Sequence, residues 1–406
     1  MYIIRHLEHT VSRLAGMFGA VLVTGPRQVG KTTMLKKITA GIPYITLDDP
    51  IMMQTACEEA GSFFKSMPPP VFVDEIQYAP NLFPYIKMII DGEKKKGQFY
   101  FSGSQQFRMM KNVSESLAGR LGIAQMSGLS LREIKGVDFY ACFRPTDDYF
   151  AERRQNLVAA DYRETWKIIH RGYMPELAVN DSLDWQSFYA AYTKTYIERD
   201  VRDLSQVGDE LAFLKFMAAI ASMTGNLLNL ASLAQDVGIS APTAQRWLSV
   251  LMAADLVYLL PPYYNNALKR VIKTHKVYFL DTGLAAYLTK WSSAEVLETG
   301  AMAGAFFESF VIAEIIKSYR NAGQEPPLYF YRDRDGNEID LLIAGDGTLY
   351  PIEIKKTANP QKGDIRAFAL LDKIAGMRRG PGGLVCMYDS LIALQGEDRV
   401  IPLHYL

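Results

Sequence analysis

The sequence feature that most constrains this chain is an apolar run, Ala20–Thr24, which leads through a glycine-bounded loop into Lys31-Thr32-Thr33. The segment fits the pattern G-x-x-x-x-G-K-[ST], in which glycines let backbone N–H groups approach phosphate oxygens closely. The lysine adds a positive charge, and the threonine hydroxyl can ligate Mg²⁺. A helix expected to begin near Lys31 adds the positive end of its dipole. The pattern therefore predicts a phosphate-binding P-loop made of Gly25, Pro26, Arg27, Gln28, Val29, Gly30, Lys31, Thr32 and Thr33.

Short apolar runs alternate with helical patterns from residue 20 to about residue 135. This alternation is typical of a parallel sheet whose strands are joined by crossover helices. Five strands are expected, over residues 21–24, 44–47, 71–74, 99–102 and 123–126.

The third of these runs ends in two carboxylates, Asp74 and Glu75. Parallel sheets bind their ligands at the carboxyl ends of the strands, so Asp74 is suited to hold Mg²⁺ through water. Glu75 is suited to orient and polarise an attacking water.

Two further residues have two possible roles each. Ser104 is either a phosphate sensor or part of a plain turn. Arg120 is either a surface residue or a finger that reaches phosphate in its own chain or in a neighbouring subunit.

Residues 25–33, 73–77, 101–104 and 117–120 together resemble the AAA+-type bacterial and archaeal ATPases that carry an uncharacterised, DUF4143-like C-terminal region. The resemblance implies an α/β fold, a P-loop NTPase domain of the additional-strand class, with ATP and Mg²⁺ as cofactors. It assigns the usual roles to Lys31, Thr32, Asp74 and Glu75. What ATP hydrolysis drives does not follow from it.

The 406 residues carry no net charge, so composition alone demands neither nucleic acid nor an anionic membrane as a partner. Three widely spaced cysteines, Cys57, Cys142 and Cys386, are typical of a reducing compartment. The N-terminal residues do not resemble a signal peptide, and no apolar run is long enough for a membrane span. We expect a cytoplasmic protein with four segments: an ATPase domain (1–135), a helical connector (136–205), a winged helix-turn-helix (206–292) and a nuclease-like domain (293–406).

The connector is rich in aromatic residues at helical spacing, which we expect to be core residues: Tyr162, Trp166, Trp185, Tyr189, Tyr192 and Tyr196. The charged run at 195–203 is either a solvated helix or a segment that senses the nucleotide through Arg199 or Arg202.

Residues 229–251 read as helix, glycine turn and helix, with Gly238 ending the first helix and Ser240 capping the second. Gln245 and Arg246 are expected to point outward. Two strands follow, and the loop between them resembles a wing. In the DNA-binding interpretation, the helix meets bases while the wing grips phosphates. The alternative is a module that docks proteins or covers the ATPase. The basic residues of the expected wing are Lys269, Arg270, Lys273 and Lys276.

Toward the C-terminus, two strands flank Asp346-Gly347, a strong signal for a two-residue hairpin. This turn places Asp340 directly opposite Glu353, with Lys355 on the same face. Because facing like charges repel, a divalent cation held by Asp340 and Glu353 is one expectation. The alternative is that Lys355, Lys356 and Arg332 or Arg334 neutralise the pair.

Glu308, Asp340, Glu353 and Lys355 in this order resemble the PD-(D/E)xK nuclease superfamily, although Ile339 replaces the proline of the motif. The resemblance implies a restriction-endonuclease-like α/β domain with these four residues as its catalytic set.

The sequence as a whole is compatible with two alternative functions. The first is an ATP-dependent protein that acts on DNA, with metal-dependent cleavage. The second is a nucleotide-driven switch that binds protein partners and cuts nothing. A homo-oligomer is compatible with both.

Overall fold

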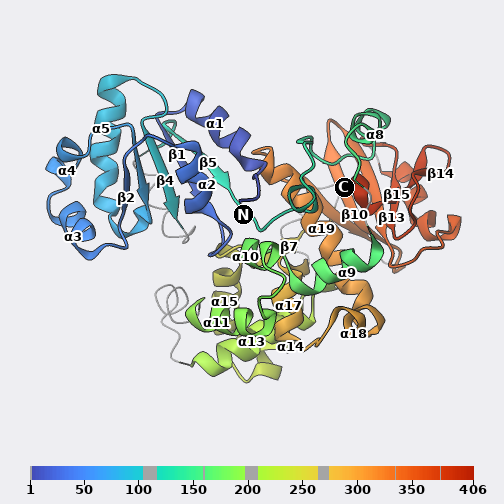
Figure 1. The fold of residues 1–406 in the computed structure, drawn as a ribbon. Coiled ribbons are helices and arrows are strands. Elements are labelled where there is room, and N and C mark those ends of the chain that lie inside the picture. The colour runs from blue at the N-terminus through green and yellow to red at the C-terminus, as the bar shows by residue number, and fades with distance from the viewer. Residues whose placement is uncertain are drawn as a thin grey trace.

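The computed structural model describes residues 2–103, 117–158, 161–196, 209–263, 274–333, 335–374 and 376–406. Figure 1 shows an N-terminal sheet with its helices, a helical middle part and a C-terminal sheet, with helix α19 lying between them. Within the described ranges, no helix combines the length and the apolar character that crossing a membrane requires.

The N-terminal sheet has the five parallel strands that the sequence predicts. They lie in the order β2-β3-β4-β1-β5, so that β4 is inserted between the strand before the P-loop and the strand that ends in Asp74. Every residue of β1 is buried, as expected for a central parallel strand covered on both faces. The bounds are β1 (Ala20–Thr24), β2 (Tyr44–Thr46), β3 (Val71–Asp74), β4 (Phe99–Gly103) and β5 (Leu121–Gln125).

Among the described residues, five α-helices accompany this sheet. The first contacts the C-terminal part of the chain, because the Thr10 hydroxyl donates to the carbonyl oxygen of Asn321 at 2.7 Å. Asp49 begins another helix by accepting from two of its backbone N–H groups, as an N-cap does. The helices are α1 (Leu7–Met17), α2 (Lys31–Ile38), α3 (Pro50–Glu58), α4 (Ala60–Ser66) and α5 (Phe83–Glu93).

The predicted connector is helical. Its aromatic residues Trp166, Tyr189 and Tyr192 are buried, which confirms their expected place in the core. The same prediction is wrong for Tyr162, which is 45% exposed at the start of its helix. Arg199 and Arg202 lie outside the described residues. The helices are α7 (Leu131–Ile134), α8 (Asp147–Arg154), α9 (Tyr162–Arg171), α10 (Pro175–Val179) and α11 (Trp185–Tyr196).

The middle part contains the predicted pair of helices. Gly238 ends the first with φ of 81°, and the Ser240 side chain caps the second by accepting from the Thr243 N–H. Trp247 is buried whereas Gln245 and Arg246 are exposed, as the sequence predicts. Three strands pair in the order β6-β8-β7. The elements are α13 (Glu210–Ser222), β6 (Asn226–Leu227), α14 (Leu230–Val237), α15 (Ala241–Ala253), β7 (Val257–Leu260) and β8 (Lys276–Phe279).

The C-terminal part is a mixed sheet in the order β14-β15-β13-β11-β10-β9, with β12 beside β11. Asp346 and Gly347 both have positive φ, the conformation of a tight hairpin turn between β10 and β11. The predicted register is confirmed: Gly345 faces Thr348 and Leu341 faces Ile352. The strands are β9 (Leu328–Arg332), β10 (Glu338–Gly345), β11 (Thr348–Ile354), β12 (Arg378–Arg379), β13 (Gly383–Cys386), β14 (Ile392–Gln395) and β15 (Asp398–Pro402).

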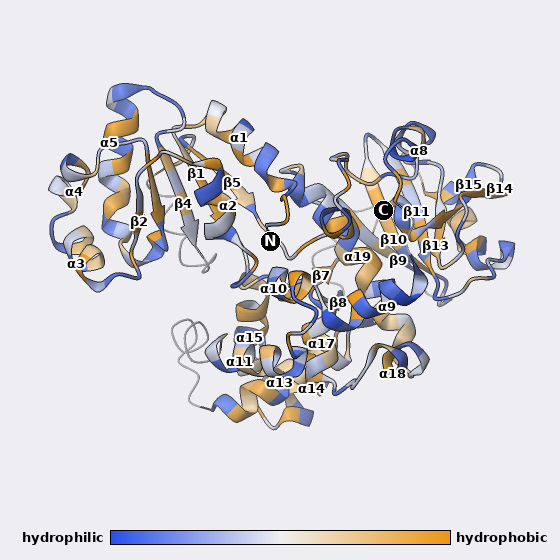
Figure 2. Ribbon diagram, viewed as in Figure 1, coloured by the Kyte–Doolittle hydropathy of each residue, from blue (hydrophilic) through white to orange (hydrophobic). Residues whose placement is uncertain are grey.

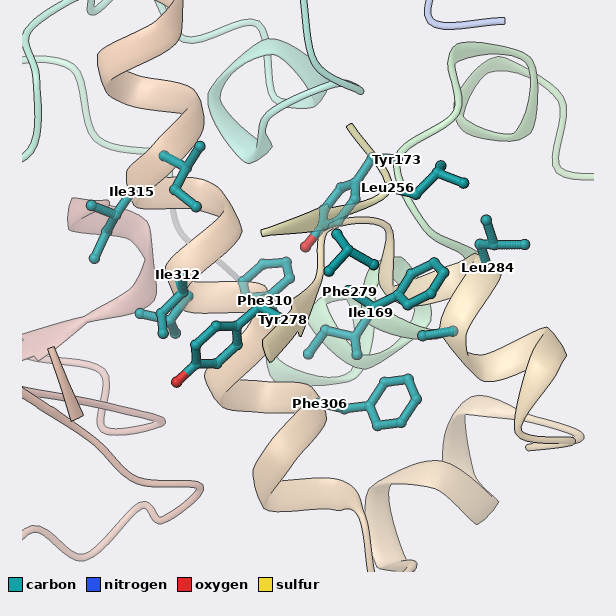
Figure 3. Packing of buried hydrophobic residues seen from close by; sticks show 14 of the residues in the cluster. Ile169, Tyr173, Leu256, Tyr278, Phe279, Leu284, Phe306, Phe310, Ile312 and Ile315 are labelled. Atoms are coloured by element: carbon teal, nitrogen blue, oxygen red, sulfur yellow. The ribbon is translucent and has the colours of Figure 1, made fainter. Parts of the chain in front are cut away.

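Helix α19 (Ala303–Asn321) follows α17 (Thr282–Leu288) and α18 (Ala294–Thr299). It is buried on nearly all sides, which is typical of a central helix rather than of a surface helix. One hydrophobic core contains residues from all four predicted segments, and Figure 2 shows hydrophobic residues on the strands of both sheets and along α19. The labelled residues of α19 in Figure 3 are Phe306, Phe310, Ile312 and Ile315, shown with Ile169, Tyr173, Leu256, Tyr278, Phe279 and Leu284 of the surrounding elements.

Candidate functional site

The P-loop follows β1 directly and has the backbone that its glycines allow. Gly25 has φ of 142°, and a Cβ atom there would lie 2.0 Å from the carbonyl oxygen of Met126. Gly30 has φ of 94° immediately before α2 begins at Lys31. Because side chains are excluded at the first position and strained at the second, both glycines are needed for this loop.

Lys31 is buried against its own loop. Its Nζ donates to the carbonyl oxygens of Gly25 at 2.9 Å and Pro26 at 2.6 Å. The ammonium therefore lies beside the backbone that would surround a phosphate, and a phosphate oxygen can replace these carbonyls as its partner.

The P-loop meets the acidic strand end through a hydrogen bond. Thr32 Oγ1 donates to Asp74 Oδ1 at 3.0 Å, although the two residues are far apart in the sequence. Tyr44 donates to Asp74 Oδ2 at 3.0 Å, and the Ser102 hydroxyl also donates to Oδ1. Asp74 is 5% exposed, so a buried carboxylate is held here by neutral hydroxyl groups.

Tyr44 and Ser102 are partners that the sequence analysis did not identify. Ser102 ends the run on the neighbouring strand, so its place at this edge could have been found from the parallel order. Tyr44 gives no comparable signal, because it begins its strand rather than ending it. Burial and the nearby Asp74 carboxylate raise the pKa of Tyr44 to about 12.

Glu75 follows Asp74 in a left-handed conformation, with φ of 56°. Its N–H donates to Ser102 Oγ at 3.2 Å, and the Gln77 amide donates to its carboxylate. These contacts hold the Glu75 side chain at the edge of the sheet where the P-loop lies. Ser104, the other candidate at this edge, is outside the described residues.

Arg120 lies at the amino-terminal ends of the strands, opposite the carboxyl ends where the P-loop begins. Its carbonyl oxygen accepts from the Ala20 N–H, so it stands beside the start of β1, whereas the P-loop follows the end. The two ends of the five-residue strand β1 are about 13 Å apart. The Arg120 guanidinium instead pairs with Asp91 at 2.5 Å. The prediction that Arg120 reaches phosphate within its own chain is therefore wrong; a contact with a neighbouring subunit stays a prediction.

Arg5 is a further residue at the P-loop that the sequence analysis missed. One guanidinium nitrogen donates to the Val29 carbonyl oxygen at 2.6 Å, and another donates to Ser127 at 2.7 Å. Its Nε lies 3.0 Å from the Glu133 carboxylate. A lone arginine near the N-terminus carries no motif, so only the folded chain reveals that it ties the loop to the segment after β5.

A second concentration of charge lies at the end of the β10/β11 hairpin. Lys355 Nζ is 2.7 Å from Glu353 Oε1 and 3.8 Å from Asp340 Oδ2. Asp340 Oδ2 also accepts from the Ile354 N–H at 2.9 Å. The structure therefore brings together the three predicted residues of this hairpin.

Glu308, on α19, is connected to these hairpin residues through Lys276, for which the sequence predicts a different role. Lys276 Nζ lies 3.2 Å from Glu308 Oε1, 2.5 Å from Glu338 Oε1 and 3.8 Å from Asp340 Oδ1. The expected role of Lys276 as a wing residue that grips DNA phosphates is wrong, because it is 4% exposed and belongs to β8. The other expected wing residues, Lys269, Arg270 and Lys273, lie outside the described residues. We call Glu308, Glu338, Asp340 and Glu353 the acidic cluster.

Burial strongly affects the acidic cluster. Together with the Asp340 carboxylate, it raises the pKa of Glu308 to about 7 and that of Glu353 to about 8. Burial opposes the charged form of Lys276, yet the carboxylates of Glu308, Asp340 and Glu338 raise its pKa above the ordinary value. Glu353 Oε2 is buried and has no hydrogen-bond partner among the described residues.

The cluster is neutralised by a different set of cations than the sequence suggests. Lys355 acts as expected, and Arg332 lies 3.6 Å from Glu338. Lys356 instead donates to the carbonyl oxygen of Glu298, and Arg334 lies outside the described residues. In the described part of the chain, no three His, Cys, Asp or Glu side chains are arranged to hold a metal ion.

The parallel sheet, the P-loop and the Asp74 carboxylate beside Thr32 define a P-loop NTPase fold. Comparison with protein families agrees. Residues 18–135 match the AAA domain model (AAA_14), residues 162–295 match a domain of unknown function (DUF8612), and residues 303–406 match a domain of unknown function (DUF4143). The N-terminal part of the chain is therefore similar to AAA-type ATPase domains, and its C-terminal part to the DUF4143 domain.

Two uncharacterized mycobacterial proteins are similar to most of this chain. Rv2008c of Mycobacterium tuberculosis and Mb2031c of Mycobacterium bovis are each 28% identical over 354 residues, covering 87% of this chain and 74% of the relative. Among solved structures, the Walker-type ATPase PABY2304 of Pyrococcus abyssi is 14% identical, with a TM-score of 0.44, over 70% of this chain and 94% of that chain. A RuvB variant of Thermotoga maritima is 18% identical with a TM-score of 0.28, over 62% and 85% of the respective chains.

Proposed function

We propose that the N-terminal domain binds ATP with Mg²⁺ and hydrolyses it at the junction of the P-loop and β3. The observation that carries this proposal is the 3.0 Å hydrogen bond between Thr32 and Asp74, since both ligand oxygens must lie together to share one ion. Bound Mg²⁺ would neutralise charge on the β- and γ-phosphate oxygens. The Thr32 hydroxyl would be its direct protein ligand, with Asp74 holding it through water.

The other residues take roles that their positions allow. Lys31 exchanges the carbonyls of Gly25 and Pro26 for phosphate oxygens, and the remaining loop N–H groups surround the phosphates. Glu75 orients the attacking water and accepts its proton at a carboxylate oxygen. Gln77 supports this role, because its amide donates to the Glu75 carboxylate and fixes the side chain.

Paired variants test this assignment. We expect Lys31→Ala to lose binding of a fluorescent ATP analogue, whereas Glu75→Gln keeps binding and loses phosphate release. Lys37→Ala, on the exposed side of α2, is the matched control and should behave as wild type. Phosphate release by Glu75→Gln at the wild-type rate would refute the role of Glu75.

The second candidate function is metal-dependent cleavage of DNA by the C-terminal domain. The observation that favours it is the meeting of Asp340, Glu353 and Lys355 at one end of the hairpin, as the PD-(D/E)xK resemblance requires. Glu308 joins them from the preceding long helix. In this proposal, Asp340 and Glu353 hold the metal ion, and Lys355 steadies the attacking hydroxide or the scissile phosphate.

We further infer that residues 206–292 act as a winged helix that carries DNA to this domain. The support is the exposed position of Gln245 and Arg246 on α15, beside the three-stranded sheet. The number of phosphate contacts sets the salt slope of binding, so a linear fall of log affinity with log salt is expected for duplex DNA. A flat slope would exclude DNA binding by this part of the chain and would favour a role in binding protein partners.

Cleavage is tested separately by incubating duplex and single-stranded DNA with Mg²⁺ or Mn²⁺. The cleavage proposal predicts products with the wild type and none with Glu353→Ala. Intact substrate with both proteins leaves the nucleotide-driven switch, which binds partners without cutting.

A further inference from the structure

We propose that the Lys276 ammonium is the resident cation of the acidic cluster and keeps divalent metal ions out of it. Lys276 belongs to β8 of the middle sheet, whereas the carboxylates belong to α19 and the C-terminal sheet. The proposal rests on the second candidate function, because it concerns control of the same site. It assigns the middle part of the chain a role in deciding whether that site holds metal.

The geometry places Lys276 where the carboxylates converge. Oxygens of Glu308, Glu338 and Asp340 lie 3.2, 2.5 and 3.8 Å from the one nitrogen atom. Oxygen ligands surround Ca²⁺ at about 2.3–2.6 Å and Mg²⁺ at about 2.0–2.1 Å. A divalent ion held by Asp340 and Glu353, as in the second candidate function, would share the Asp340 carboxylate with the Lys276 ammonium, and the two positive charges would repel each other.

Lys276 is held firmly in this position. Its strand pairs with β6 and β7, and it is 4% exposed. The residues after β7 are hydrogen-bonded to β9: Tyr263 N–H donates to the Phe330 carbonyl at 2.7 Å, and Phe330 N–H donates to the Pro261 carbonyl at 3.0 Å. Backbone contacts therefore fix β8, through β7, relative to the C-terminal sheet, and the buried Lys276 side chain lies within the cluster.

Glu353 gives an independent indication that the cluster has capacity for a further cation. It is 6% exposed, and its Oε1 is paired with Lys355, while Oε2 has no hydrogen-bond partner in the described chain. A buried acceptor left in this state is costly unless something binds it.

The balance of charge points the same way. Four carboxylates face Lys276, Lys355 and, at the rim, Arg332. Without Lys276, the cluster would carry two excess negative charges once all four carboxylates are ionised, as metal binding would require, and one divalent ion neutralises that charge.

The test is a Mn²⁺ titration of the full chain without nucleotide, followed by electron paramagnetic resonance of free Mn²⁺. All proteins carry Asp74→Asn, which removes the metal ligand of the P-loop site. We expect no Mn²⁺ site with Lys276 present, and one site with K276M that binds at least tenfold more tightly than the background. Adding Glu353→Gln to K276M should abolish this gain, and K276R, which keeps a cation, should stay metal-free. Circular dichroism establishes that each variant is folded.

Two results would overturn the proposal: Mn²⁺ binding that depends on Glu353 while Lys276 is present, or a folded K276M that binds no Mn²⁺. If K276M does not fold, K276Q replaces it in the same comparison, and Mn²⁺ binding that depends on Glu353 while Lys276 is present overturns the proposal whether or not either variant folds. DNA cleavage is measured in parallel. A K276M that gains Mn²⁺ without cutting DNA would support the resident cation and contradict the nuclease proposal, so the two failures are distinguishable.

Discussion

The two acidic sites of this chain compensate their buried carboxylates in different ways. Asp74 accepts from the hydroxyl groups of Thr32, Ser102 and Tyr44, which carry no charge. The acidic cluster is instead paired with ammonium groups, above all that of Lys276. Hydroxyl donors satisfy hydrogen bonds but leave the negative charge available to a metal ion, whereas an ammonium neutralises it.

This difference indicates which site is ready for metal chemistry. At the P-loop, Thr32 can turn its oxygen from Asp74 toward Mg²⁺ by side-chain rotation. At the acidic cluster, the buried Lys276 ammonium would have to give up its contacts with three carboxylates. The same residue types at strand ends therefore give an open site in one domain and a closed one in the other.

The largest effect that separates the two sites is expected for the aspartates. Asp74→Asn should lower Mg²⁺-dependent ATP hydrolysis by about 1,000-fold, since Mg²⁺ contributes several kcal/mol of transition-state stabilisation. The matched change Asp340→Asn should leave hydrolysis within about twofold of wild type. Phosphate release at saturating ATP measures both. Equal losses in the two variants would show that the sites are not independent.

The next effect concerns stability rather than activity. Lys276→Ala should reduce the free energy of unfolding by about 3–5 kcal/mol, because it leaves buried carboxylates without their cation. Lys355→Ala should cost less than about 1 kcal/mol, since the Lys355 side chain is 43% exposed. Urea unfolding followed by circular dichroism compares the two.

Added Mn²⁺ sharpens this comparison. A metal that binds the folded Lys276→Ala protein stabilises it by mass action, about 2.7 kcal/mol when its concentration is 100 times the dissociation constant. Wild type in the same buffer should gain nothing at this site. If Mn²⁺ stabilises wild type and Lys276→Ala equally, Lys276 does not keep the metal ion out of the acidic cluster, and the inferred difference between this cluster and the P-loop site is wrong.

Effects smaller than that of Lys276→Ala are expected for the tyrosines at each site. Tyr278 donates to Glu308 at 2.5 Å and is buried, so Tyr278→Phe should cost about 1.5–3 kcal/mol of stability. Tyr44→Phe should cost about 1 kcal/mol or less, because Tyr44 is 39% exposed and Asp74 keeps two other donors. The same urea experiment measures both, and the reverse order would contradict the account of how each carboxylate is held.

Most of the N-terminal site could be predicted from sequence because its signals are local. The P-loop pattern and the carboxylates after a buried run specify both the elements and the edge of the sheet where they meet. The hairpin register was predictable for a similar reason, since the Asp346-Gly347 turn determines which residues face each other.

The residues that the sequence did not reveal make contacts between distant segments. Lys276 lies next to a basic run and resembles a wing residue until β8 is seen to pack beside α19. Arg5 reaches the P-loop from a segment without any motif. The periodicity of helices and strands reports which face is buried, but it does not report which charged partner a different segment supplies.

The most direct test of the central claim is calorimetric titration of a non-hydrolysable ATP analogue with and without Mg²⁺, in wild type and in Asp74→Asn. If Thr32 and Asp74 share one Mg²⁺ ion on a bound triphosphate, Mg²⁺ should tighten binding to wild type at least tenfold and should have no such effect on Asp74→Asn. Equal Mg²⁺ dependence in both proteins, or no binding heat in either, would contradict it.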